Sequence, residues 1–267
     1  MKRVLLNLLI LGLMPVIAFS QTRENRPVAA FSKIEASSVF DITVEKGSSE
    51  SLAIEADEEA LPYVHSEVQD GVLHLYIDNK AYKIEKINLL KAYIVMKDLD
   101  RVTLSGACKF TSEDLFTSNK FECGCSGASS LSVNVNTNQL DIEMSGAGKI
   151  LIKAEVADEA NLNMSGASKV QGELTAGNVF FNSSGICSVE LTGSATDLNM
   201  DVSGASKIMA ENFMVKTATI KSSGVSKVRI NVSDSLKVDS SGPSSVSYAG
   251  SPTIEVNNSK MARINKI

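Results

Sequence analysis

The feature that most constrains this chain is a Ser-Gly pair that returns every 18 to 21 residues. Eight such pairs begin at Ser105, Ser126, Ser145, Ser165, Ser184, Ser203, Ser223 and Ser241. A regular short period is typical of repeat proteins, in which each unit buries its apolar face only by stacking on its neighbours. The sequence therefore predicts a solenoid, to which the usual relation between chain length and domain count does not apply.

The residues on both sides of each pair alternate between apolar and polar. Residues 140–144 (LDIEM) precede one pair, and residues 227–232 (KVRINV) follow another. Alternation with a period of two indicates strands with one buried face. When the repeats are aligned on the glycine, the positions four before and four after it are apolar in every repeat. The predicted fold class is all-β: a parallel β-helix, or β-solenoid, with Ser-Gly repeats of about 20 residues.

The repeated glycines fall between two inward-facing apolar columns, where a flat coil must turn. They are Gly106, Gly127, Gly146, Gly166, Gly185, Gly204, Gly224 and Gly242. Glycine tolerates positive φ and takes little room inside a bend. We interpret these glycines as the corners of the repeat, and we expect them to form one column with a spacing of about 4.8 Å.

The four cysteines could form disulfides in an exported protein, since their number is even. The repeat register nevertheless places Cys108 and Cys187 four coils apart, at about 19 Å, which is too far for a bridge. Cys123 and Cys125 lie two residues apart on one strand, where closure is also unfavourable. We therefore expect four free thiols, buried as small apolar side chains.

Residues 1–20 have the pattern of a secretory signal peptide. Lys2 and Arg3 precede an apolar run that ends at a small-residue cleavage site. The run is short for a membrane anchor and contains Pro15, so no transmembrane span is expected in the mature chain. Gln21 follows the predicted cleavage site where a lipoprotein would have cysteine. The mature protein is predicted to be exported to the periplasm, the cell surface or the medium.

The remaining chain divides into four predicted regions. An N-terminal segment at 21–30 leads into a β region at 31–104, the Ser-Gly solenoid occupies 105–250, and a strand or cap follows at 251–267. Within the β region we expect strands at 32–47 and 51–57, a helical turn at 57–62, and a hairpin at 64–78 with Asp70-Gly71 at its tip. No linker separates the β region from the repeats, which favours one continuous stack.

Three stretches together resemble a known family. "FSKIEASSVFDITVEKG", then "LPYVHSEVQDGVLHLYI", then the recurring "LSGACKF", "MSGAGKI" and "MSGASKV" are similar to the head GIN domain family of autotransporter adhesins. The similarity covers roughly residues 30–248. The resemblance implies a bacterial exported β-helical domain with an adhesin label, and it supplies no catalytic residue.

Parallel β-helices also include polysaccharide lyases and hydrolases, which need clustered carboxylates in a groove walled by long loops. The short repeat leaves little chain for such loops, and Glu143, Asp201 and Asp239 share one column on separated coils. The sequence predicts no catalytic residue, no metal ligands and no cofactor. An exported non-enzymatic β-solenoid, acting as an adhesin or envelope interaction domain, is the favoured function. A carbohydrate-active β-helix enzyme is the alternative.

The most suggestive exposed feature is a lysine column three residues after the glycine. It contains Lys109, Lys149, Lys169, Lys207 and Lys227. On an acidic chain, whose net charge of -5 becomes -7 when Lys2 and Arg3 are removed, such a stripe could bind an anionic glycan or cell-surface component. Lysines on a sheet face also improve solubility and deter unwanted strand pairing. The acidic balance without a basic domain argues against nucleic acid as a partner.

Overall fold

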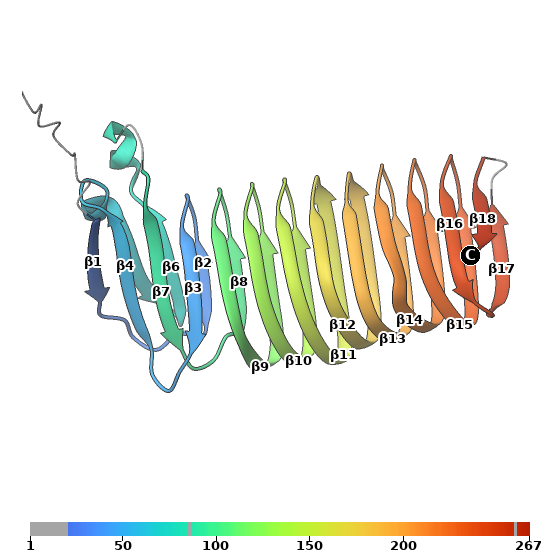
Figure 1. The fold of residues 1–267 in the computed structure, drawn as a ribbon, viewed down its shortest axis with the longest axis horizontal. Coiled ribbons are helices and arrows are strands. Elements are labelled where there is room, and N and C mark those ends of the chain that lie inside the picture. The colour runs from blue at the N-terminus through green and yellow to red at the C-terminus, as the bar shows by residue number, and fades with distance from the viewer. Residues whose placement is uncertain (1–20, 85–86, 259–260) are drawn as a thin grey trace, which may run out of the picture.

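The structure is a computed structural model that describes residues 21–84, 87–258 and 261–267. It confirms the predicted fold class, because most of the described residues are in strands and the strands stack as parallel coils (Figure 1). The predicted signal peptide lies outside the described residues. In the described part of the chain, no helix is long and apolar enough to cross a membrane.

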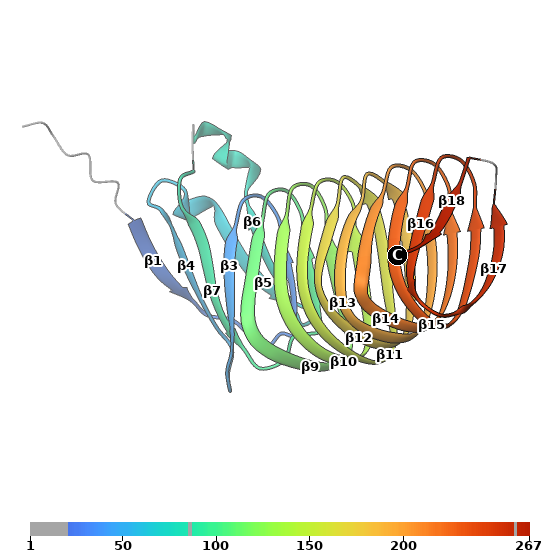
Figure 2. The ribbon, with the colours of Figure 1, turned by 45° about the vertical axis from the view of Figure 1, so that its right-hand side comes forward.

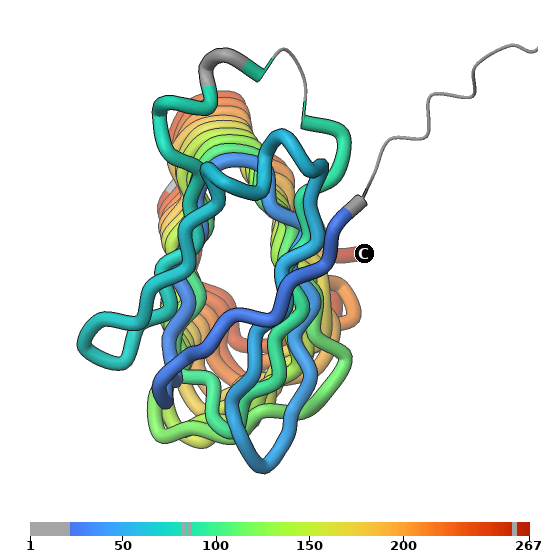
Figure 3. Tube along the Cα trace, turned by 90° about the vertical axis from the view of Figure 1, so that its left-hand side faces the viewer, coloured from blue at the N-terminus to red at the C-terminus, as the bar shows by residue number. Residues whose placement is uncertain are grey.

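Each repeat forms one flattened coil. Its long strand runs along one side, bends, and returns along the other, as Figure 3 shows along the solenoid axis. In β11, residues 149–156 and 159–164 pair in parallel with the two halves of β10, and the register shifts at the bend. The strands of this kind are β9 (Lys109–Cys125), β10 (Ser130–Met144), β11 (Lys149–Gly166), β12 (Lys169–Gly185), β13 (Ser188–Val202), β14 (Lys207–Ser222) and β15 (Lys227–Ser240).

Two parallel sheets result, with the apolar core between them. The halves that follow each Ser-Gly corner form the sheet that we call the lysine face, and the halves that lead into the corner form the serine face. On the serine face, Ile142, Leu162 and Phe181 lie opposite one another on consecutive strands and are buried. Each inward apolar side chain therefore packs on the apolar side chain at the same position of the next coil. This packing explains why the same positions are apolar in every repeat.

The corner glycines form a single column. All eight have positive φ. A Cβ added to Gly127 would lie 2.4 Å from the carbonyl oxygen of Gly106, and one added to Gly166 would lie 2.5 Å from that of Gly146. The same close approach recurs at each corner, where consecutive coils lie backbone against backbone. A side chain has neither the conformation nor the space that it would need there.

A buried hydroxyl closes most of these corners. The residue two positions after the glycine is small and buried. Where it is serine, its hydroxyl donates a hydrogen bond to the backbone carbonyl of the serine three positions earlier. This hydrogen bond measures 2.7 to 3.4 Å for Ser129, Ser168, Ser206, Ser226 and Ser244. Because a buried hydroxyl needs a partner, the Ser-Gly-x-Ser pattern supplies its own.

The N-terminal region begins with an irregular first coil. β2 (Lys33–Ala36) and β3 (Asp41–Lys46) pair in parallel with β8 (Arg101–Leu104) and with the start of β9. Ser38, with φ of 86°, occupies the corner that glycine takes in later coils, and Gly106 lies against its backbone. The N-terminal strands therefore continue directly into the repeats.

Antiparallel strands extend both sheets at the N-terminal end (Figure 3). On the lysine face, β7 (Leu90–Met96) pairs in parallel with β3, and β4 (Ser51–Asp57) and β1 (Gln21–Arg26) then add in antiparallel fashion. On the serine face, β6 (Val72–Ile77) joins β2. β5 (Val64–Gln69) forms the predicted hairpin with β6 through Asp70-Gly71.

Two short helical turns lie in the same region. In place of the helical turn expected at 57–62, the chain has a turn followed by the 3-10 helix η1 (Leu61–Tyr63). A second 3-10 helix, η2 (Asn79–Lys83), was not expected. It begins where the Asp78 carboxylate accepts a hydrogen bond of 2.9 Å from the backbone amide of Lys80, which is a usual way to start a helix.

The C-terminal segment forms one more coil. β16 (Ser245–Gly250) and β17 (Thr253–Asn258) both pair with β15, and β18 (Arg263–Lys266) pairs with β16. Ile254 and Val256 continue the inward columns of Leu236 and Val238. They are 39% and 43% exposed because theirs is the last coil described.

All four cysteines are buried and free, as the repeat register predicted. Burial raises the pKa of the Cys108 thiol. Burial, with a smaller contribution from Cys108, raises the pKa of Cys125 to about 12. Burial also raises the pKa of Cys123 well above its usual range. Since the thiolate is the reactive form, these side chains are chemically protected.

We expect the folded protein, prepared without reductant, to react slowly with a thiol reagent at pH 8. Denaturation should expose four titratable thiols, because the four cysteines are free and unfolding brings all four buried side chains into solvent. The measurement is a thiol titration with and without denaturant. Fewer than four thiols, together with a bridge mapped by mass spectrometry, would contradict this coil register.

Candidate functional site

The structure brings the five predicted lysines into one row across the lysine face. Lys149 lies opposite Lys169, and Lys207 opposite Lys227, on adjacent strands. Ser130 lies between Lys109 and Lys149, and Ser188 lies between Lys169 and Lys207. We call these five lysines the lysine stripe.

Two further basic residues extend the row. Arg263 lies opposite Ser245, which in turn lies opposite Lys227. At the other end, Asp41 lies opposite both Lys109 and Lys91. Sequence alignment on the glycine missed Arg263 and Lys91, because neither follows a Ser-Gly pair.

The ion pairs of the stripe leave much of its charge uncompensated. Lys109 lies 3.6 Å from the Asp41 carboxylate, and Lys169 lies 3.8 Å from that of Glu190. Among the residues that the structure describes, Lys149, Lys207 and Lys227 form no ion pair, and all three are exposed. Adjacent like charges about 4.8 Å apart reinforce one another's potential, so the row can attract an anion.

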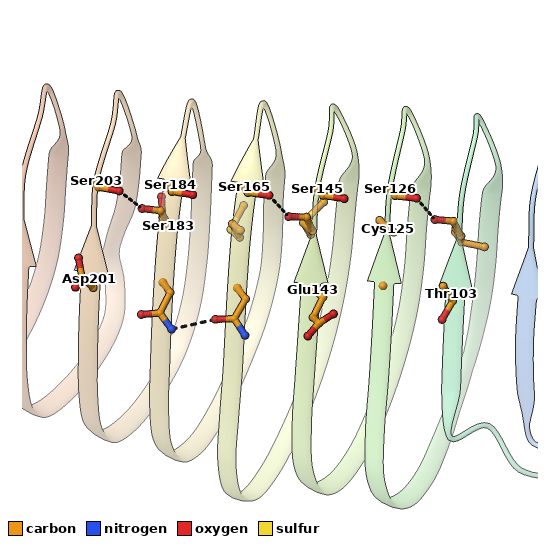
Figure 4. Close-up of a pocket in the computed structure, with 16 residues that line it drawn as sticks. Thr103, Cys125, Ser126, Glu143, Ser145, Ser165, Ser183, Ser184, Asp201 and Ser203 are labelled. Carbon is orange, nitrogen blue, oxygen red and sulfur yellow. Dashed lines mark hydrogen bonds between the residues drawn. The ribbon is translucent and has the colours of Figure 1, made fainter.

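A shallow groove of about 590 Å³ runs along the serine face beside the corners (Figure 4). The groove crosses several coils because two outward-facing columns of the serine face carry only small or polar side chains. Gly124, which has no side chain, adds to the hollow. Its lining residues are Thr103, Leu104, Gly124, Cys125, Ser126, Glu143, Met144, Ser145, Asn163, Met164, Ser165, Asn182, Ser183, Ser184, Asp201 and Ser203.

Many polar groups of this groove are bonded to the neighbouring coil. Figure 4 shows the hydroxyls of Ser126, Ser165 and Ser203 directed at the coil before them. They donate to backbone carbonyls at 3.3, 3.1 and 3.1 Å. The Asn182 amide donates to the Asn163 side-chain oxygen at 2.9 Å. These bonds hold coils together, and they reduce the number of groups available to a ligand.

The carboxylates of the groove do not form a catalytic pair. Glu143 and Asp201 share the outward column, with Asn163 and Asn182 between them, so they lie three coils or about 14 Å apart. Glycosidases place their two carboxyl groups about 5 to 9.5 Å apart. Asp239, the third acidic residue singled out in the sequence, lies two coils farther along. Over the described ranges, no three metal-ligating side chains gather into a group.

Comparison with protein families finds a family model that matches this chain twice. The family described as "Putative auto-transporter adhesin, head GIN domain" matches residues 30–158 and again residues 151–252. The two matches together cover the first coil, the N-terminal cap strands from β2 onward, and nearly all repeats. A search among curated proteins finds no match.

Solved structures share the fold. A protein named "putative adhesin" from Parabacteroides distasonis matches with a TM-score of 0.72 and 18% identity, over 93% of this chain and 97% of that one. A "putative adhesin" from Parabacteroides merdae matches with a TM-score of 0.68 and 18% identity, over 92% and 96%. A "Putative lipid binding protein" from Parabacteroides distasonis gives 0.67 and 18%, also over 92% and 96%. At these identities the likeness shows the fold alone.

Proposed function

This chain belongs to the family described as "Putative auto-transporter adhesin, head GIN domain", and we propose that it is an exported, non-enzymatic β-solenoid that binds an anionic component of a cell surface. The observation that carries the proposal is the lysine stripe, whose members share one register across the coils. A polymer or surface whose negative charges repeat along a line fits such a row, and an acidic polysaccharide is a convenient probe of it.

The stripe would act through many weak contacts. A single exposed ion pair contributes little in salt. Once one charge of a linear polyanion is held, however, the next meets its lysine at a high effective concentration, so the contacts reinforce one another. Binding of this kind weakens steeply as ionic strength rises, because the charges are exposed and screened.

Two observations favour this proposal over a carbohydrate-active enzyme. The acidic residues of the serine-face groove lie on coils too far apart for a glycosidase pair. Within the part of the chain that the structure describes, the turns between coils are short and no long loops wall the groove. Export, as the predicted signal peptide implies, would place the stripe where it could meet envelope or host polymers.

Replacement of Lys149, Lys169, Lys207 and Lys227 by serine tests the proposal. We expect the variant to bind an acidic polysaccharide such as heparin at least tenfold more weakly, because the row loses four of its five lysines. The melting temperature should change by no more than about 2 °C, since serine already occupies this column at Ser130, Ser188 and Ser245.

The matched control removes four exposed lysines outside the stripe, by serine replacement of Lys153, Lys216, Lys221 and Lys237. Both variants carry the same net charge, so a general electrostatic effect would weaken them equally. Heparin affinity chromatography and cell-adhesion counts compare the two. Equal retention of the stripe variant and the control would leave the stripe with a role in solubility alone.

A further inference from the structure

An unbroken apolar ridge runs along the corners of the solenoid. The residue directly after each corner position points away from the core and is exposed in every coil. We call this set the corner ridge, and it consists of Val39, Ala107, Ala128, Ala147, Ala167, Ile186, Ala205, Val225 and Pro243. The largest members are Ile186, 68% exposed, and Val225, 65% exposed. Single exposed apolar residues are ordinary, but a continuous row usually marks an interaction surface.

The backbone of the ridge presents few free hydrogen-bond donors. The amide of Ala128 donates to the Gly106 carbonyl at 2.7 Å, and the amides of Ile186 and Val225 donate to the preceding corners at 2.7 and 2.8 Å. The same bond is made at Ala107, Ala147, Ala167 and Ala205. Pro243 has no amide hydrogen. An edge whose donors are already satisfied can leave water at much lower cost than an ordinary turn.

From Ala107 to Pro243 the charged residues beside the ridge are all basic, whereas Val39 at the N-terminal end has Asp41 two residues after it. Within Ala107–Pro243, the two residues on either side of each ridge position include no carboxylate. Serines border the ridge on the serine face. On the lysine face, the residue two after the ridge position is a lysine of the stripe in five coils and a serine in three, at Ser130, Ser188 and Ser245. Lysine side chains are long enough to extend toward the ridge while their ammonium groups stay in water.

The geometry points to an anionic lipid surface as the partner of this edge. Ridge side chains would enter the boundary between headgroups and acyl chains, and the stripe would lie against lipid phosphates. Apolar area combined with basic residues is what holds a protein in the membrane interface. A soluble polysaccharide would engage the lysines but leave the ridge in water. This inference rests on the proposed function and names the chemistry of its ligand.

The shape of the molecule suits a flat partner. The corners of the coils form a continuous edge, and at its N-terminal end the segment that contains η2 stands beyond it (Figures 1 and 2). Because every coil places its ridge residue at the same point of the repeat, many corners can reach a bilayer together. Each contact is weak alone, and their sum gives reversible association that salt reduces.

Vesicle sedimentation tests the inference. Wild type should bind vesicles of equal parts phosphatidylcholine and phosphatidylglycerol, and bind phosphatidylcholine alone at least tenfold more weakly. The double variant Ile186→Ser, Val225→Ser should lose about tenfold in binding to the anionic vesicles. The matched control is Leu115→Ser, Met214→Ser, whose side chains are 55% and 62% exposed away from the corners. The control should bind as wild type does. Equal loss in both double variants would overturn the inference.

Tryptophan fluorescence reports insertion directly, since the chain contains no tryptophan. Ala167→Trp places the only indole on the ridge, and Met214→Trp places it in the strand away from the corners. With anionic vesicles, the emission of the ridge variant should shift to shorter wavelength, and that of the control should stay unchanged. No shift at the ridge, while the protein sediments with the vesicles, would also overturn the inference.

Heparin separates the two proposals. The ridge variant should keep wild-type heparin affinity, and the stripe variant should lose both heparin and vesicle binding. Wild type that binds heparin but no vesicles would overturn the lipid assignment and leave the polyanion site intact. Wild type that binds neither would overturn both.

Discussion

Replacement of Gly166 by alanine is expected to lower the free energy of unfolding by about 2–5 kcal/mol. The left-handed backbone at φ of 74° costs a residue with a Cβ about 1–2 kcal/mol. The new methyl group would also lie 2.5 Å from the Gly146 carbonyl oxygen and 2.8 Å from its amide nitrogen, so two stacked coils must separate locally. Overpacking of this kind adds about 1–3 kcal/mol. Denaturant unfolding of the two proteins measures the difference.

Gly71 provides the control that isolates the contact between coils. Its φ of 72° nearly equals that of Gly166, but a Cβ added there would meet nothing within 4 Å. Gly71→Ala should therefore show only the conformational cost, about 1–2 kcal/mol. If the two variants lost the same free energy of unfolding, the contact between corner backbones would contribute nothing to the cost of the Gly166 substitution.

A second large effect is expected at two adjacent phenylalanines of β12. Phe181 points into the core and is 2% exposed, whereas Phe180 points outward and is 36% exposed. Phe181→Ala should cost about 3–5 kcal/mol, because it removes a buried ring and leaves a cavity between Leu162 and Met200 on the neighbouring strands. Phe180→Ala should cost less than about 1 kcal/mol.

Thermal and denaturant unfolding of both phenylalanine variants test this expectation. Neighbouring residues share local chain flexibility and β-propensity, so a difference between them reports burial alone. A larger loss for Phe180→Ala would mean that the alternation of faces in this strand is reversed, since a slip of one residue exchanges the two sides of a strand.

Much of the solenoid could be predicted from the sequence, because its determinants are local and repeated. A glycine that must turn, an apolar residue four positions away and a small buried residue two positions after it recur in each coil. Any single repeat is a weak signal, but eight in phase fix the register of the whole stack. The register then placed Lys149 beside Lys169 without further information.

The N-terminal cap could not be predicted in the same way. β4 pairs in antiparallel fashion with β7, yet β7 shows the same alternation as a strand of a parallel coil. Whether two strands pair in parallel or antiparallel fashion depends on the path of the chain that connects them. The composition of the strands themselves does not reveal that path. The sequence predicted the strand at 51–57, but of the antiparallel pairings it indicated only the β5–β6 hairpin, because Asp70-Gly71 marks a tight turn.

The groove and the corner ridge were missed for a different reason. Each depends on a column that carries no obvious chemistry, such as the alanine-rich position after the glycine. Their significance lies in exposure, in amides such as that of Ile186 bonded across coils, and in a side chain missing at Gly124. A column of small apolar residues one position after every corner was a signal present in the sequence, but burial was needed to interpret it.

Because successive coils pair in the same register, the solenoid can be lengthened or shortened by whole repeats. One inserted repeat of about 20 residues lengthens the edge by about 4.8 Å and leaves both ends unchanged, because each coil bonds only to its immediate neighbours. Each added unit can bring one more ridge residue and one more lysine or serine. Binding strength could then change over generations by duplication or loss of whole units, in graded steps, without redesign of any single contact.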